Sequence, residues 1–250
     1  MVAFQDYLLT YAKSFIPLYP QIKTIRTTYD LIEHLKYEYS YLPNELVFLF
    51  NHFFEYVTID KFFWITLGSI AFNPIFWNIA ARLEYNNRIL TKLAFNSPKL
   101  GCYILAITIF SLGIFRDSIY HEFLKLQPTY APIEESLIVK FIAVLVFLFG
   151  NVLVVSSMYS LGVTGTYLGD YFGILMNERV TGFPFNINDN PMYNGSTLCF
   201  LGTALWYGKP SGILISGFVY VMYKIALLFE EPFTAKIYAK RDEELKKKEI

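Results

Sequence analysis

Long uncharged stretches recur along the chain, and they predict helices that cross a membrane. A helix needs about 20 apolar residues to span the hydrocarbon core of a bilayer. Four regions approach that length: 62–81, 100–115, 141–158, and a double region made of 190–208 and 210–229. Lys99 and Arg116 flank the second region, where their long side chains can reach the membrane surface.

The double region predicts a helical hairpin. Its two halves are separated by Gly208-Lys209-Pro210, which is a turn signal, so we expect arms at 195–208 and 211–229. The predicted fold class is therefore all-α: a polytopic membrane bundle with a C-terminal helical hairpin and an N-terminal amphipathic extension.

The first 60 residues differ from the rest because charged residues are spread among apolar ones. No apolar core precedes a small-residue cleavage site, so a cleaved signal peptide is not expected. Residues 44–57 predict a helix that lies on the membrane surface or, equally, packs on the rest of the fold. The expected domains are an extension at 1–60, a membrane-embedded domain at 61–241 and a charged cytosolic tail at 242–250.

Basic residues predict the orientation in the membrane. Lys and Arg gather in loop 82–99 and in the tail after residue 230, whereas loop 116–136 is richer in acidic residues. Short basic loops favour the cytosol. Segment 159–194 is then cytosolic if 190–229 forms a hairpin, and lumenal if only 210–229 crosses. The basic first loop favours the hairpin.

Composition excludes several classes of protein. The chain of 250 residues is 54% hydrophobic and 17% charged, and its formal net charge is zero. A soluble domain carries more charge, and a disordered chain fewer apolar residues. No basic surface for nucleic acid is expected. The three His and two Cys residues form no metal-binding spacing, so we expect no metal.

Segment 159–195 concentrates Gly, aromatic and polar residues. Its glycines at 162, 165, 169 and 173 have helical spacing, which favours close approach of another helix or, less commonly, of a ligand. The run Asn188-Asp189-Asn190-Pro191 predicts a turn whose side chains bond its own backbone.

An acidic pair, Glu230-Glu231, stands where the second hairpin arm is expected to end. Carboxylates at the C-terminus of a helix oppose its dipole. We therefore interpret the pair as functional rather than as a polar cap. The hairpin brings Glu230 and Tyr193 to the same membrane face, where they form one site.

At these residues the chain resembles the small phospholipid N-methyltransferases that make phosphatidylcholine. The similarity runs from about residue 62 to 241, and residues 1–60 have no counterpart. The matching blocks are 72–78, 162–175, 179–185, 189–193, 195–197 and 230–235.

The resemblance implies an enzyme that uses S-adenosylmethionine to convert phosphatidyl-N-methylethanolamine, through the dimethyl lipid, to phosphatidylcholine, with phosphatidylethanolamine as a further substrate. It also implies two cofactor-binding elements. One is the acidic pair, Glu230 and Glu231. The other is a Gly-x-Gly motif that aligns with Leu148, Phe149 and Gly150, where Leu148 replaces the first glycine.

Transfer to an amine requires the neutral amine, so a proton acceptor is needed. The candidate catalytic residues are Asp189, Tyr193 and Glu230. Aromatic faces suit the cationic groups involved, and the candidate residues for such a cage are Phe183, Phe185, Tyr193 and Tyr171.

Two alternatives remain open: an enzyme like the isoprenylcysteine carboxyl methyltransferases, and a non-enzymatic membrane scaffold. The first shares the general turn and Glu-Glu pattern, and the second explains the hydropathy alone. Lys247 and Lys248 resemble a dilysine retrieval signal. The expected location is the endoplasmic reticulum membrane, with the mitochondrial membrane as a second location.

Overall fold

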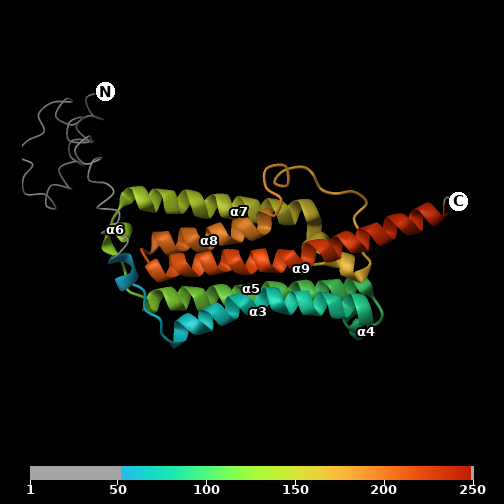
Figure 1. Cartoon of the computed structure of the whole chain (residues 1–250), viewed down its shortest axis with the longest axis horizontal. Coiled ribbons are helices and arrows are strands. Elements are labelled where there is room, and N and C mark those ends of the chain that lie inside the picture. The colour runs from blue at the N-terminus through green and yellow to red at the C-terminus, as the bar shows by residue number, and fades with distance from the viewer. Residues whose placement is uncertain (1–51, 249–250) are drawn as a thin grey trace, which may run out of the picture. The chain divides into compact units, whose positions relative to one another are not determined.

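The computed structural model describes residues 52–248, and this part of the chain is helical and contains no strand. The all-α fold class is confirmed. Most of the predicted extension at 1–60, with its surface helix, lies outside the described residues. The elements in chain order are α3 (Lys61–Asn87), α4 (Ile89–Leu93), α5 (Pro98–Leu126), α6 (Ala131–Glu134), α7 (Leu137–Thr166), the 3-10 helix η2 (Gly169–Phe172), α8 (Pro191–Trp206) and α9 (Pro210–Lys248) (Figure 1).

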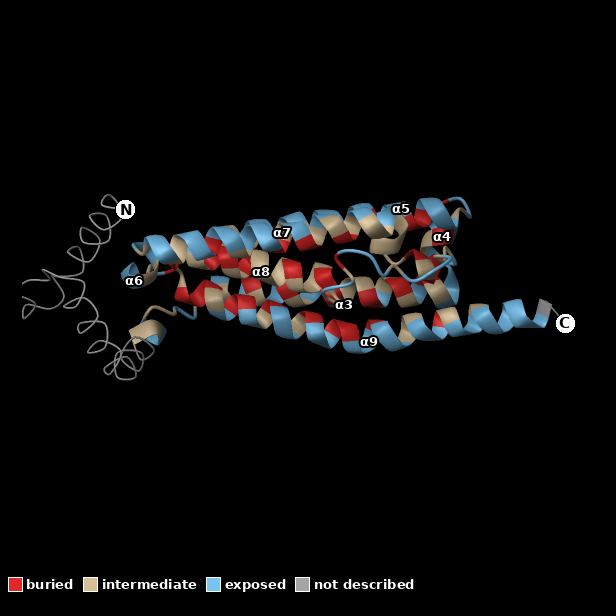
Figure 2. Ribbon diagram, turned by 90° about the horizontal axis from the view of Figure 1, so that it is seen from above, coloured by how far each residue is buried: buried red, intermediate tan, exposed pale blue. Residues whose placement is uncertain are grey.

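Four segments are long and apolar enough to cross a membrane: Lys61–Asn87, Pro98–Leu126, Leu137–Phe172 and Pro210–Lys247. Their outer faces carry large exposed apolar side chains, such as Phe110, Phe141 and Leu228, and the outer face of α7 is exposed along its length (Figure 2). A water-soluble protein does not expose apolar surface on this scale. The chain is a multi-pass membrane protein, as the hydropathy pattern predicted.

The helices are longer than the apolar stretches that predicted them. Helix α5 continues past residue 115 to Leu126, so Arg116 lies within the helix and is buried. The expectation that Arg116 reaches the membrane surface is wrong. Helix α9 likewise continues through Glu230, Glu231 and Pro232 to Lys248. The acidic pair is not at a helix end, so the argument from the helix dipole does not apply. Polar residues interrupt a hydropathy pattern without ending a helix when they face other helices.

The predicted hairpin is present. Helices α8 and α9 lie side by side and are joined by a short connector at 207–209 (Figure 1). Lys209 ties this connector to the segment before α6, because its Nζ donates to the Gln127 carbonyl and to Thr129 Oγ1, both at 2.7 Å. Partial burial lowers the pKa of Lys209. The first arm, α8, has 16 residues and starts within the bundle.

The loops are divided between the two ends of the bundle in the way that the charge pattern predicted. At one end, the Tyr130 amide donates to the Gly208 carbonyl, which joins the α5–α7 connection to the hairpin turn. At the other end, Arg241 Nη1 donates to the Met176 carbonyl at 2.7 Å, and α4 lies at this end too (Figure 1). Loop 82–99, segment 173–190 and the end of α9 therefore share one end, as the favoured hairpin orientation requires.

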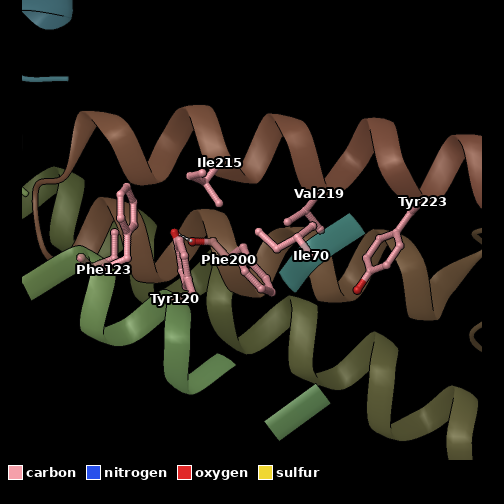
Figure 3. Packing of buried hydrophobic residues seen from close by; sticks show 8 residues of the cluster. Ile70, Tyr120, Phe123, Phe200, Ile215, Val219 and Tyr223 are labelled. Carbon is pink, nitrogen blue, oxygen red and sulfur yellow. Dashed lines mark hydrogen bonds between the residues drawn. The ribbon is translucent and has the colours of Figure 1, made fainter. Parts of the chain in front are cut away.

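The core lies where α3, α5, α8 and α9 meet. Figure 3 shows Tyr120 between these helices, with its hydroxyl donating to the Phe200 carbonyl at 3.0 Å. This bond ties α5 to α8 in the interior. The other buried members of this cluster are Ile70, Phe123, Leu124, Ile215, Val219 and Tyr223.

The glycines at 162–173 do not form one helical stripe. Gly162 has φ 64° and ψ −178°, and it bends the chain inside α7. Only glycine adopts this backbone geometry readily. Gly169 starts η2, and Gly173 follows it with φ 78°. These glycines allow the chain to turn back across the end of the bundle, where it covers the site described next.

Candidate functional site

A cavity of about 670 Å³ lies between the helices, and its lining includes Phe185 and the exposed Asp189 of segment 173–190. Apolar side chains of α5 and α7 form much of its wall. Several polar groups face it from α5, α9 and the start of α8: Arg116, Asp117, Asp189, Asn190, Tyr193, Tyr223 and Glu230. Few polar groups in a mainly apolar cavity of this size are typical of a small-molecule site.

Glu230 is the most closely held acidic group of this cavity. Its side chain accepts hydrogen bonds from Trp77 Nε1 at 2.5 Å, from Asn78 Nδ2 at 2.7 Å and from the Tyr193 hydroxyl. The residue is only 8% exposed. A buried carboxylate inside a membrane protein is costly unless it is partnered. Three donors, two from α3 and one from α8, fix both of its oxygens in one position.

The contact between Tyr193 and Glu230 confirms the expected proximity of two motifs 37 residues apart. The contact joins α8 to α9, and α8 also packs tightly on α7. A Cβ on Gly150 would lie 2.6 Å from the Gly195 carbonyl oxygen, and a Cβ on Gly195 equally close to that of Gly150. Both positions therefore require glycine. This contact holds α8 against α7 at Gly195, which is only two residues from Tyr193.

Trp77 and Asn78 complete the Glu230 site, and sequence reasoning missed their role. Both lie in the 72–78 block, which matches the family but for which no function was predicted. Asn78 Nδ2 also donates to the Pro74 carbonyl at 3.0 Å. Arg82 lies one turn further and donates to Asn78 Oδ1 at 3.3 Å. The sequence signal that could have identified this role is the polar Asn78 in an apolar span, with Arg82 four positions later.

The cavity mouth is formed by the predicted turn. Asn188 Oδ1 accepts from the Asn190 amide at 2.9 Å, so the side chain bonds its own backbone as expected. Asp189 is exposed and lines the cavity. Asn190 Nδ2 donates to Glu231 Oε1 at 3.1 Å. Glu231 is exposed and reaches the rim of the cavity through this bond, whereas Glu230 points inside.

The aromatic residues near Glu230 differ from the four that the sequence suggested. Tyr193 and Phe185 line the cavity, but Tyr171 stacks on Phe233, with ring centroids 5.0 Å apart, and Phe183 is 48% exposed. Instead, Trp77 and Tyr223 join Tyr193: the Tyr193–Tyr223 centroids are 5.0 Å apart, and Trp77 is 6.4 Å from each. We call Trp77, Tyr193 and Tyr223 the aromatic cluster.

The predicted Gly-x-Gly position is not part of this cavity. Among the described residues, the cavity lining includes none of Leu148, Phe149 and Gly150. Leu148 and Phe149 are at least half exposed on the outer face of α7. Gly150 is buried against Gly195, where it allows the two helices to meet. The cofactor-binding role of these three residues stays a prediction, and the geometry gives Gly150 a packing role.

Comparisons with known proteins show the family of this chain. Residues 138–241 match the family described as phospholipid methyltransferase. Over 190 residues the chain is 62% identical to the phosphatidyl-N-methylethanolamine N-methyltransferase of Schizosaccharomyces pombe, which covers 76% of this chain and 96% of the relative. The chain belongs to the phospholipid methyltransferase family. The membership confirms the resemblance and excludes the non-enzymatic scaffold.

This phospholipid methyltransferase is also similar to proteins from other organisms. The phosphatidyl-N-methylethanolamine N-methyltransferase of Saccharomyces cerevisiae is 61% identical over 180 residues, or 72% of this chain and 86% of the relative. The phosphatidylethanolamine N-methyltransferase of Homo sapiens is 45% identical over 183 residues, or 73% of this chain and 91% of the relative. No solved structure matches the chain.

Proposed function

We propose that this phospholipid methyltransferase uses S-adenosylmethionine to methylate phosphatidyl-N-methylethanolamine and then the dimethyl lipid, which yields phosphatidylcholine. Phosphatidylethanolamine is a further substrate. The observation that carries the proposal is the buried carboxylate of Glu230, held beside the aromatic cluster at a cavity with a polar mouth and apolar walls. Such a site suits a cationic donor and an amine on a lipid.

The residues at the cavity fit S-adenosylmethionine. This co-substrate carries a sulfonium and an ammonium group, and carboxylates and aromatic faces attract both. Glu230 and the aromatic cluster would hold the sulfonium end, while Glu231 and Asn190 at the mouth would hold the polar end. When bound, S-adenosylmethionine supplies an electrophilic methyl group. A cavity of about 670 Å³ lies within the usual range for ligand sites, roughly 300–1,000 Å³.

The protein's own residues position the amine and receive its proton. An alkylammonium with a pKa like that of Lys, about 10.4, is mostly protonated at neutral pH and must lose a proton before it attacks. Asp189 lies at the exposed mouth, so it can accept that proton and release it to water. Glu230 already accepts three hydrogen bonds, so we assign it to charge stabilisation. Tyr193 orients it.

Substrate scope tests the proposal. Membranes that contain the protein would be incubated with labelled S-adenosylmethionine and, separately, with each of the three ethanolamine lipids and a prenylated cysteine peptide. We expect label in phosphatidylcholine from the monomethyl and dimethyl lipids, and weaker labelling from phosphatidylethanolamine. Label in the peptide alone would favour the isoprenylcysteine enzyme. A Glu231→Gln variant is expected to raise the KM for S-adenosylmethionine without changing the lipid preference.

The endoplasmic reticulum, with the mitochondrial membrane as a second location, is the compartment that we propose for this multi-pass protein. Lys247 is exposed on the last turns of α9, at the same end as the cavity mouth. Microscopy of the tagged chain beside a marker of each membrane tests this placement, and a signal that follows neither marker would overturn it.

A further inference from the structure

Arg116 is a buried charged residue that has no role in the methyl transfer proposed so far. It lies on α5 between membrane-crossing helices and is 8% exposed. Its Nη1 donates to the Tyr223 hydroxyl at 2.6 Å, and its Nε and Nη2 donate to Asp117 Oδ1 at 2.9 and 2.8 Å. Ionisable groups in a membrane interior are expensive and typically mark ligand sites or pathways.

The Arg116 guanidinium lines the cavity and has N–H groups that are not used in hydrogen bonds to the protein. An arginine carries five N–H groups in a planar fork, and Nε, Nη1 and Nη2 each use one. Within residues 52–248 the remaining two have no hydrogen-bond partner. Asp117, whose side chain is 58% exposed, is the one carboxylate in an ion pair with Arg116 in this range. A guanidinium fork matches the geometry of a phosphate group.

The aromatic cluster lies directly between Arg116 and Glu230. Tyr223 receives the arginine's hydrogen bond and packs on Tyr193, and Tyr193 donates to Glu230. Aromatic faces attract alkylammonium groups. One cavity therefore offers a cation site next to an anion site. That pairing is complementary to a zwitterion whose amine and phosphate are joined by a two-carbon bridge.

The order of these groups along the bundle follows the order within a phospholipid. Glu230 lies two helical turns beyond Tyr223 on α9, towards the end with the polar mouth, and Arg116 lies at the level of Tyr223. Further along the bundle, towards the end that carries α6, is a smaller pocket of about 280 Å³ with a mostly apolar lining that includes Val144, Leu148 and Trp206. A lipid in the leaflet next to the mouth has its amine outermost, its phosphate next and its acyl chains deepest.

We propose that Arg116 binds the phosphodiester of the lipid substrate and thereby places the amine at the aromatic cluster. Tyr223 orients the guanidinium, and Asp117 competes with the phosphate for it. The acyl chains leave through the apolar region between α5 and α7. Arg116 is thus the residue that makes the enzyme select a phospholipid over other lipid amines. This inference rests on the proposed methyl transfer to a lipid.

The test compares two acceptors in mixed micelles: phosphatidyl-N-methylethanolamine, and 1,2-dioleoyl-3-methylaminopropane, which has the methylamine but no phosphate. For Arg116→Gln we expect the KM for the phospholipid to rise by about 10- to 100-fold. The KM for the phosphate-free lipid and the Kd of S-adenosylmethionine should stay within about twofold of the wild type. Arg116→Lys keeps the charge without the fork and should give an intermediate KM. Lys125→Gln, an exposed substitution on the same helix, is the matched control.

An Asp117→Asn variant gives the opposite sign and keeps the test independent of folding defects in the arginine variants. Removing the competing carboxylate should lower the KM for the phospholipid by about two- to threefold. An equal rise in KM for both lipids in Arg116→Gln, a raised KM in Asp117→Asn, or weaker S-adenosylmethionine binding as the main effect would overturn the inference. If the wild-type protein methylates no lipid at all, the proposed function itself fails instead.

Discussion

At the scale of single residues, the site depends on how one buried carboxylate is held. Glu230 accepts from the adjacent Trp77 and Asn78 on α3 and from Tyr193 on α8, so the site joins two distant parts of the sequence. The motif around Tyr193 and the acidic pair were visible in the sequence, because both break an apolar pattern. Trp77 was not, because a tryptophan in a membrane span is ordinarily explained by packing or by the membrane interface.

Tyr193→Phe tests the tyrosine's contribution to the site. The substitution keeps the ring in the aromatic cluster but removes the hydroxyl that donates to Glu230, so the carboxylate loses one of three donors. We expect the rate of methyl transfer to fall by about 10- to 100-fold, since a hydrogen bond to a charged group contributes about 1.5–3 kcal/mol. Initial rates with labelled S-adenosylmethionine measure it. Tyr220→Phe, on the exposed face of α9, should match the wild type.

At the scale of elements, the close contact of α7 and α8 positions the site. Gly150 and Gly195 let the two backbones meet. The sequence predicted the existence of both helices and the turn between α8 and α9 from hydropathy and turn residues. It did not predict that α5 and α9 extend far beyond their apolar stretches, because hydropathy records lipid-facing surface, whereas Arg116 and Glu230 continue the helices on inward faces.

Gly150→Ala tests this helix contact. The added Cβ would meet the Gly195 carbonyl at 2.6 Å, and backbone atoms cannot rotate away. We expect a loss of stability of about 1–3 kcal/mol, as for other overpacked sites, seen as a lower midpoint of thermal unfolding in detergent. Gly217→Ala, in a helix with open space at the Cβ position, is the control and should not lower the midpoint. Equal midpoints for both variants would contradict the packing role.

At the scale of the whole molecule, membrane topology decides which compartment supplies the cofactor. Loop 82–99, segment 173–190 and the end of α9 lie at one end, and α6 lies at the other (Figure 1). From the sequence alone, the basic residues predict that the first end is cytosolic. Both topologies satisfy the hydropathy pattern, so the sequence left open whether segment 159–194 lies at the same end as the basic loop. The fold places segment 173–190 at that end, and its cytosolic side stays a prediction.

Cysteine labelling in sealed vesicles tests this topology. After Cys102 and Cys199 are replaced by Ser, single cysteines at Glu178 and at Glu135 would be exposed to a maleimide that cannot cross membranes. We expect Glu178→Cys to be labelled from the cytosolic side and Glu135→Cys only after the vesicles are permeabilised. Labelling of both from the same side would contradict the hairpin arrangement.

The central claim is that the buried Glu230 makes methyl transfer possible, and the most direct measurement is the transfer rate of Glu230→Gln. The substitution keeps the shape of the side chain and removes its charge. With phosphatidyl-N-methylethanolamine and labelled S-adenosylmethionine, we predict a rate at least about 100-fold below that of the wild type, comparable to the loss of a group that stabilises charge in other enzymes. Glu122→Gln, an exposed carboxylate on α5, should keep the full rate. A Glu230→Gln protein that folds and methylates the lipid at the wild-type rate would contradict the account.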